Sequence, residues 1–220
     1  MSTSAASSSA PPRPEPTPFT DAGQRLAADH LGMWTFLTTE ILFFGGLFAC
    51  YAIYRVAYPA AFAEGSHHLE FWIGTINTAV LLTSSLAYAL GDLAIKAGRR
   101  RALTLCLLLT LALGALFLGL KFFEYYQKYQ ENLIPGAHFH VAGPHAPQVQ
   151  LFIFLYFAMT GLHAVHMMFG LGALTWLLWL NRRARLSAEY HAPVTIVGLY
   201  WHFIDCIWVF LYPLLYLIAR

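Results

Sequence analysis

Five ionisable side chains lie inside long apolar stretches of this chain, where they could do chemistry: Glu40, His163, His166, His202 and Asp205. His163 and His166 are three residues apart, and His202 and Asp205 repeat that spacing, which on a helix places each pair on one face. An ionisable group inside a bilayer is costly unless it faces protein or water, so each is a candidate functional residue. We therefore expect all five to face one another inside a helical bundle.

Three interpretations of these five residues stay open. The first is structural: a hydrogen-bonded network that fixes the register of the helices. The second is a proton relay, because carboxylates and imidazoles inside membranes often carry protons. The third is a metal site, since glutamate and histidine offer ligands for iron, zinc or copper, although the repeated Glu-x-x-His motif of di-iron bundles is missing from the sequence. We assign no metal ligand and no catalytic residue.

A second charged set lies near the end of the third apolar stretch. Lys121, Glu124 and Lys128 occupy positions i, i+3 and i+7, so on a helix Glu124 can pair with both lysines. The simplest interpretation is a charge cluster at the membrane interface. A contact between Glu124 and a partner subunit is the alternative.

Five apolar stretches must hold these side chains in place. Hydrophobic residues make up 58% of the 220 residues and charged residues only 11%, against about 25% charged in a soluble domain. Each stretch can cross about 30 Å of hydrocarbon, and the absence of alternation in the sequence favours helices over a β-barrel. The stretches cover residues 31–54, 72–95, 103–126, 149–180 and 194–218. The predicted fold is all-α, a polytopic membrane bundle of five transmembrane helices.

The charged residues outside these stretches predict the orientation. Nine of the thirteen Lys and Arg residues lie in the N-terminal segment and in the second and fourth loops, which share one side of the membrane. The positive-inside rule then places the N-terminus in the cytoplasm and the C-terminus in the periplasm. Residues 1–28 are rich in Ser, Ala and Pro, which predicts a disordered tail before a helical domain at residues 29–220.

Several classes of function find no support in the sequence. It contains no Walker loop, no GxSxG or HExxH motif and no dinucleotide fingerprint. Its three cysteines form no CxxC pair. A net charge of +2 without a basic stripe argues against a nucleic-acid partner. We expect no catalytic centre in this chain.

Four segments resemble subunit III of the haem-copper oxidases, the cytochrome c and quinol oxidases. They are TEILFFGGLFACY, LKFFEYY, TGLHAVHMMFGLGAL and YWHFIDCIWVFLYPLLYL, beginning at Thr39, Leu120, Thr160 and Tyr200. The combination of GLHxxH with WHFxD is specific, and the resemblance runs from about Leu31 to the C-terminus. It implies that the family's functional positions fall on Glu40, Glu124, His163, His166, His202 and Asp205.

The resemblance implies a non-catalytic, multi-pass subunit in the inner membrane of a bacterium. It implies packing on oxidase subunit I and association with subunit II, with membrane lipids and with further subunits of a respiratory supercomplex. Haems and copper then belong to the partner subunits and this chain holds none, although it can bind phospholipid. Its expected role is to support the stability and proton uptake of subunit I during aerobic electron transport.

The seven-helix members of the family have two additional N-terminal helices, where this sequence has a Ser/Ala/Pro-rich tail, so the chain resembles the short five-helix form. That form is found among bacterial cytochrome c and quinol oxidases, so the electron donor stays open. It also resembles accessory proteins of nitric oxide reductases, which is one alternative function. The other alternative is an autonomous membrane metalloprotein built on Glu40, His163, His166 and His202.

Overall fold

The computed structural model describes residues 22–67, 69–131, 133 and 145–218, and in these residues it contains six α-helices and no strand. The all-α prediction is confirmed. The helices are α1 (Ala22–Ala57), α2 (Pro59–His67), α3 (Phe71–Lys96), α4 (Arg100–Gln130), α5 (Ala146–Arg182) and α6 (Ala192–Tyr216).

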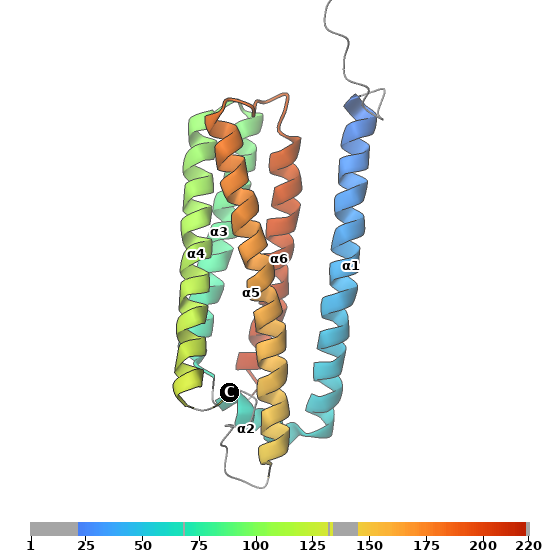
Figure 1. Cartoon of the computed structure of the whole chain (residues 1–220), viewed down its shortest axis with the longest axis vertical. Helices are drawn as coiled ribbons and strands as arrows, with labels where there is room; N and C mark the ends of the chain where they lie inside the picture. The colour runs from blue at the N-terminus through green and yellow to red at the C-terminus, as the bar shows by residue number, and fades with distance from the viewer. Residues whose placement is uncertain (1–21, 68, 132, 134–144, 219–220) are drawn as a thin grey trace, which may run out of the picture.

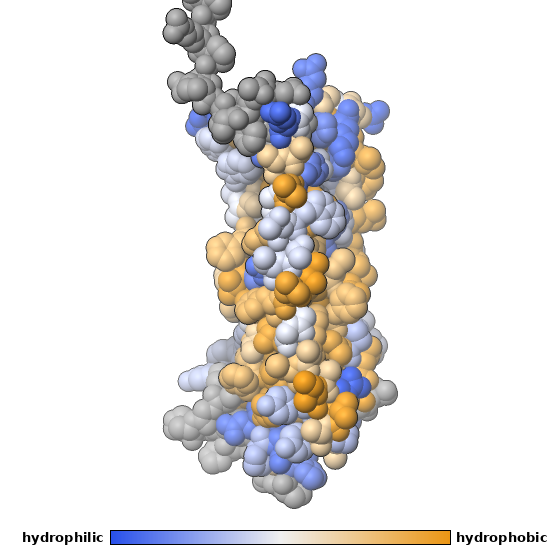
Figure 2. Space-filling view, turned by 90° about the vertical axis from the view of Figure 1, so that its right-hand side faces the viewer, coloured by the Kyte–Doolittle hydropathy of each residue, from blue (hydrophilic) through white to orange (hydrophobic). Residues whose placement is uncertain are grey.

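The five long helices confirm the predicted membrane spans. In the described part of the chain, α1, α3, α4, α5 and α6 are long and apolar enough to cross a membrane. Even the shortest of them, α6, has 25 residues and is therefore about 37 Å long. Figure 2 shows hydrophobic side chains across the middle of the molecule and hydrophilic ones gathered at its two ends. The chain is a multi-pass membrane protein.

The largest differences from the sequence prediction are the start of α1 and the presence of α2. Helix α1 begins at Ala22, so residues 22–28 are helical although we assigned them to the disordered tail. Ala, Gln, Arg and Leu in this segment are good helix formers, and no proline follows Pro18 until Pro59. Residues 1–21 of the predicted tail lie outside the described residues. The short helix α2, which begins with Pro59, was not predicted.

Helices α3 to α6 form a four-helix bundle, and α1 lies along one side of it (Figure 1). Helix α1 contacts α5, α6 and α2. Only 17% of the residues in its most apolar window are buried, against 44% in α5 and α6. Helix α1 is therefore the span that the rest of the chain holds least tightly.

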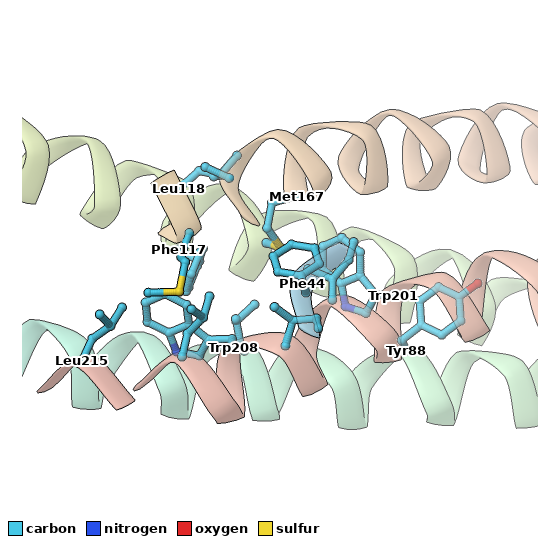
Figure 3. Close-up of a cluster of buried hydrophobic side chains, with 14 of the residues drawn as sticks. Phe44, Tyr88, Phe117, Leu118, Met167, Trp201, Trp208 and Leu215 are labelled. Carbon is cyan, nitrogen blue, oxygen red and sulfur yellow. The ribbon is translucent and has the colours of Figure 1, made fainter. Parts of the chain in front are cut away.

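The core of the bundle is built around two tryptophans of α6, Trp201 and Trp208 (Figure 3). Trp201 fits against two glycines: a Cβ atom on Gly114 of α4 or Gly170 of α5 would lie 2.8 or 2.9 Å from its ring. The ring of Trp208 meets Phe117 of α4 edge to face, with centroids 4.8 Å apart. Helix α6 is thus fixed in depth and rotation, and with it the two candidate residues that it carries.

Candidate functional site

Glu40 of α1 and His166 of α5 form a hydrogen-bonded pair, which we call the α1–α5 pair. Glu40 Oε2 lies 3.0 Å from His166 Nε2, and the two side chains are 18% and 12% exposed. The two residues are 126 positions apart in the sequence, so the pair ties α1 to the bundle in the interior of both helices. Among the described residues, no other two of the five candidate side chains contact each other through a hydrogen bond or ion pair.

The imidazole of His166 is held in one orientation. Its Nδ1 lies 2.9 Å from the backbone oxygen of Leu162, and because a carbonyl can only accept, Nδ1 must donate. Phe44 packs edge to face against the ring, with centroids 5.3 Å apart. The hydrogen bond at Nε2 therefore holds one proton, which either Glu40 or His166 donates to the other.

The α1–α5 pair forms part of the wall of a cavity of about 420 Å3. The other lining residues are Met33, Phe36, Phe169, Ala173, Val197 and Tyr200. Phe169 is 69% exposed, so the cavity lies on the lipid-facing side of α5. No described residue makes a hydrogen bond to Oε1 of Glu40, and this oxygen is left available.

His202 forms a separate contact with α3. Its Nδ1 lies 2.7 Å from the hydroxyl of Ser85, and the ring of Tyr88 packs edge to face against it at 5.9 Å. His202 also lines a second cavity, of about 520 Å3, between α6 and a neighbouring face of α1. Ser85 was not among the predicted site residues, although the Ser-Ser pair in an otherwise apolar stretch is a signal for it.

His163 and Asp205 are buried without hydrogen bonds in the described structure. His163 is 1% exposed and packs against the rings of Phe117 and Trp208, whose centroids lie 5.5 and 5.3 Å from its own. Both of its ring nitrogens and both carboxyl oxygens of Asp205 lack a hydrogen-bond partner. Ser85 is the polar group beside Asp205, but their approach does not meet hydrogen-bond geometry.

The structure does not unite the five residues in one network, which corrects the prediction from spacing. Residues three apart on a helix point about 60° apart around its axis, enough to meet different neighbours in a packed bundle. His163 therefore faces α4 and α6, whereas His166 faces α1. The four ligands expected for an autonomous metalloprotein therefore do not come together. Among the described residues, no three His, Cys, Asp or Glu side chains lie close enough to hold a metal ion.

Lys121 and Glu124 are buried inside the bundle, where they form what we call the α4 charge cluster with Tyr156 and Tyr216. The two charged side chains are 3% and 0% exposed, and Lys121 Nζ lies 2.8 Å from Glu124 Oε2. The hydroxyls of Tyr216 and Tyr156 donate to Glu124 Oε1 at 2.7 and 3.0 Å. Lys121 also donates to the Tyr216 hydroxyl at 2.5 Å and lies 4.6 Å from the centre of the Trp208 ring.

The predicted charge cluster therefore lies between helices of this chain, and no observation tests its depth in the membrane. Glu124 is enclosed within the chain, so it is not available to a partner subunit, which was the alternative. Lys128 pairs with Glu131 at 2.8 Å rather than with Glu124, whose oxygens already bind Lys121 and the two tyrosines. Tyr156 and Tyr216 were missed because they come from α5 and α6, and nothing local in the sequence links them to α4.

Comparison with known proteins gives a consistent set of matches. A family model of cytochrome c oxidase subunit III matches residues 24–220. The chain is 34% identical to cytochrome c oxidase subunit 3 of Thermostichus vulcanus, over 90% of this chain and 96% of that protein. It is 28% identical to cytochrome bo(3) ubiquinol oxidase subunit 3 of Pseudomonas aeruginosa, over 86% and 84%. A probable quinol oxidase subunit 3 of Staphylococcus haemolyticus is 30% identical, over 87% and 89%.

Proposed function

Because the chain belongs to the cytochrome c oxidase subunit III family, we propose that it is the non-catalytic subunit III of a bacterial haem-copper terminal oxidase. The observation that carries this proposal is the extent of the family match, which covers residues 24–220 and so includes all of the six helices except the first two residues of α1. The relatives that share most of their length with this chain are named as subunit 3 of cytochrome c or quinol oxidases.

The proposed partners are subunit I and subunit II, together with further subunits of a respiratory supercomplex and membrane lipids. Haems and copper belong to those partners. Helix α1 has many exposed apolar side chains, of which Trp34, Leu42 and Ile53 are 55 to 71% exposed. These side chains offer a surface for a neighbouring subunit or for lipid. The proposed location is the inner membrane, with the N-terminus in the cytoplasm.

The proposed contribution of this chain is to the stability of subunit I and its proton uptake during aerobic electron transport. The local contacts of the candidate residues support a structural role: Glu40 holds α1 to α5, and His202 joins α6 to α3 through Ser85. The α4 charge cluster joins α4, α5 and α6. A subunit built in this way gives its partner a rigid packing surface in the membrane.

Purification through an affinity tag on this chain tests the proposal. We expect a large haem-bearing subunit to co-purify and to carry oxidase activity, and we expect the chain separated from it to show no haem or copper absorbance. Stoichiometric metal in the separated chain would instead support the autonomous metalloprotein. Co-purification with a haem protein that reduces nitric oxide rather than dioxygen would support the accessory role in a nitric oxide reductase.

A further inference from the structure

We propose that the end of α5 binds the phosphate group of an anionic membrane lipid through Arg183 and Arg185, which lie beside the ring of Trp179. We call these three residues the α5 arginine site. The proposal rests on the proposed function, in which membrane lipids are partners, and it gives one class of lipid a site in this chain. The site shares no residue with the cavity that borders the α1–α5 pair.

Two arginine side chains meet one aromatic ring in the α5 arginine site. The guanidinium carbon of Arg183 lies 4.4 Å from the centre of the Trp179 ring, and that of Arg185 lies 5.7 Å from it. The attraction between a cation and the face of an indole ring holds each guanidinium group in place. Both arginines are exposed, and Trp179 is 43% exposed. The ring therefore restricts the two cations without burying their N–H donors.

The turn that follows α5 brings both arginines to the same ring. Ala184, the residue between them, has a φ of 57°, a left-handed conformation that a Cβ atom makes unfavourable. The N–H groups of Ala184 and of the next residue donate to the backbone oxygens of Asn181 and Leu180, both at 3.1 Å, as in a Schellman motif. Leu186 then anchors the turn, because it is fully buried. The fold, and not the free rotation of two side chains, thus sets the position of the site.

The two arginines have no anionic partner in the part of the chain that the structure describes. No described carboxylate forms an ion pair with either guanidinium group. At this end of the bundle Asp92 pairs with Lys96, while Asp29 and Glu189 line a cavity that neither arginine lines. Two like charges held beside one ring repel each other, and a nearby anion offsets that repulsion. The site therefore favours an anion from outside the chain.

A lipid phosphate is the anion expected at this level of the membrane. Helix α5 ends at Arg182, within one turn of Trp179, and tryptophan favours the boundary between hydrocarbon and head groups. Guanidinium groups match the oxygens of a phosphate, and anionic lipids attract arginines at the membrane surface. The loop between α3 and α4 lies at the same end of the molecule (Figure 1) and adds the exposed Arg99 and Arg101. A zwitterionic lipid would bring an ammonium group, for which the site offers no carboxylate.

The face of α5 that leads from the site toward the middle of the membrane has room for an acyl chain. Thr175, Gly172 and Met168 precede Trp179 by four, seven and eleven residues, so they share its face of the helix. All three are exposed, and a Cβ atom on Gly172 would have no other atom within 4 Å. The hydroxyl of Thr175 donates to Leu171 within the helix at 2.8 Å, so it presents no unfilled donor. An acyl chain can therefore lie along α5 while its phosphate meets the arginines.

Photolabelling of the full-length chain, purified with whatever subunits accompany it, tests the proposal. The protein is placed in phosphatidylcholine vesicles that contain a phosphatidylglycerol with a diazirine on its acyl chain, and mass spectrometry locates the label. We expect label on the last turns of α5, and we expect unlabelled phosphatidylglycerol to compete for it better than added phosphatidylcholine does. Label only elsewhere in the chain, or equal competition by the two lipids, would overturn the proposal. Displacement by inorganic phosphate as efficient as by phosphatidylglycerol would overturn it in favour of a site for free phosphate.

Matched variants separate a site from a generally basic surface. Arg183→Gln with Arg185→Gln removes both cations and is expected to lower labelling about tenfold. Arg99→Gln with Arg101→Gln removes two exposed cations from the same end of the bundle, and labelling is expected to stay within about threefold. Equal losses in the two double variants contradict the proposal.

A charge-conserving variant keeps the test decisive if the double glutamine variant assembles poorly. Arg183→Lys with Arg185→Lys retains both charges and is expected to keep labelling within about threefold of the unmodified chain. A loss as large as that of the double glutamine variant would contradict a site that depends on charge. The label is scored on this chain whether or not a haem-bearing subunit co-purifies, so a failure of this proposal is distinguishable from a failure of the proposed function.

Discussion

The α4 charge cluster and the α1–α5 pair are both acid–base contacts between membrane helices. They differ in whether both carboxyl oxygens of the glutamate accept hydrogen bonds. In the α4 charge cluster, Glu124 is fully enclosed and both of its oxygens accept hydrogen bonds. In the α1–α5 pair, Glu40 is 18% exposed, and among the described residues only Oε2 of its carboxyl group has a hydrogen-bond partner. The comparison teaches that two acid–base contacts inside the same membrane domain can differ in how far the rest of the chain encloses them.

The two contacts also join different helices. The α4 charge cluster joins three helices of the bundle, α4, α5 and α6. The α1–α5 pair holds α1, which has the smallest buried share of the five spans. We therefore expect substitutions in the α4 charge cluster to affect the folding of the bundle and substitutions in the α1–α5 pair to affect mainly the packing of α1 against it.

The largest effect is expected for Glu124→Leu. Without the carboxylate, the ammonium group of Lys121 stays buried without its counter-ion, which costs about 3 to 5 kcal/mol. The measurement is the free energy of unfolding in mixed micelles containing SDS, followed by the fluorescence of the six tryptophans. The double variant Lys121→Met with Glu124→Leu is expected to recover most of the loss, because no unpaired charge remains. A double variant as unstable as the single one would show that the tyrosine contacts, and not the ion pair, dominate.

A smaller effect is expected for Ser85→Ala, which removes the hydroxyl partner of His202. Loss of one hydrogen bond between side chains that are partly buried costs about 1 kcal/mol. The same unfolding measurement applies, with Thr83→Ala as control, since Thr83 is exposed and bonds only within its own helix. If the free energy of unfolding fell as much as it does for Glu124→Leu, the contact of His202 with α3 would stabilise the chain as strongly as the α4 charge cluster does, against this prediction.

Glu40→Gln is expected to lower the free energy of unfolding by less than about 1 kcal/mol, because the amide can still donate to His166 Nε2. In the assembled complex we expect initial oxidase turnover to stay largely intact and long-term stability to fall. Turnover is followed by oxygen consumption from the first seconds to prolonged activity. An immediate and complete loss of turnover would contradict a structural role for the α1–α5 pair and would favour the proton-relay interpretation.

The sequence predicted the spans well because a continuous apolar stretch in a membrane must satisfy its backbone hydrogen bonds internally, and a helix does so. It also identified the residues of the α1–α5 pair, since ionisable groups inside such stretches are rare and costly. It did not predict their partners. His163 and His166 share a helix but face different neighbours, and Tyr156 and Tyr216 reach Glu124 from distant parts of the chain. Spacing along one helix cannot specify which helix packs against each face.

The smallest effect is expected for Lys96→Met at the C-terminal end of α3. Lys96 lies 2.5 Å from Asp92, four residues earlier, but its side chain is 42% exposed. Water screens such a pair, so its loss should change the free energy of unfolding by less than about 0.5 kcal/mol. Asp92 also keeps the hydroxyl of Thr195 as a partner at 3.2 Å, so the substitution leaves no unpaired carboxylate. The unfolding titration used for Glu124→Leu measures the difference on the same scale. A loss near that of Glu124→Leu would mean that charge pairing stabilises this chain regardless of burial, and the contrast between enclosed and accessible pairs would fail.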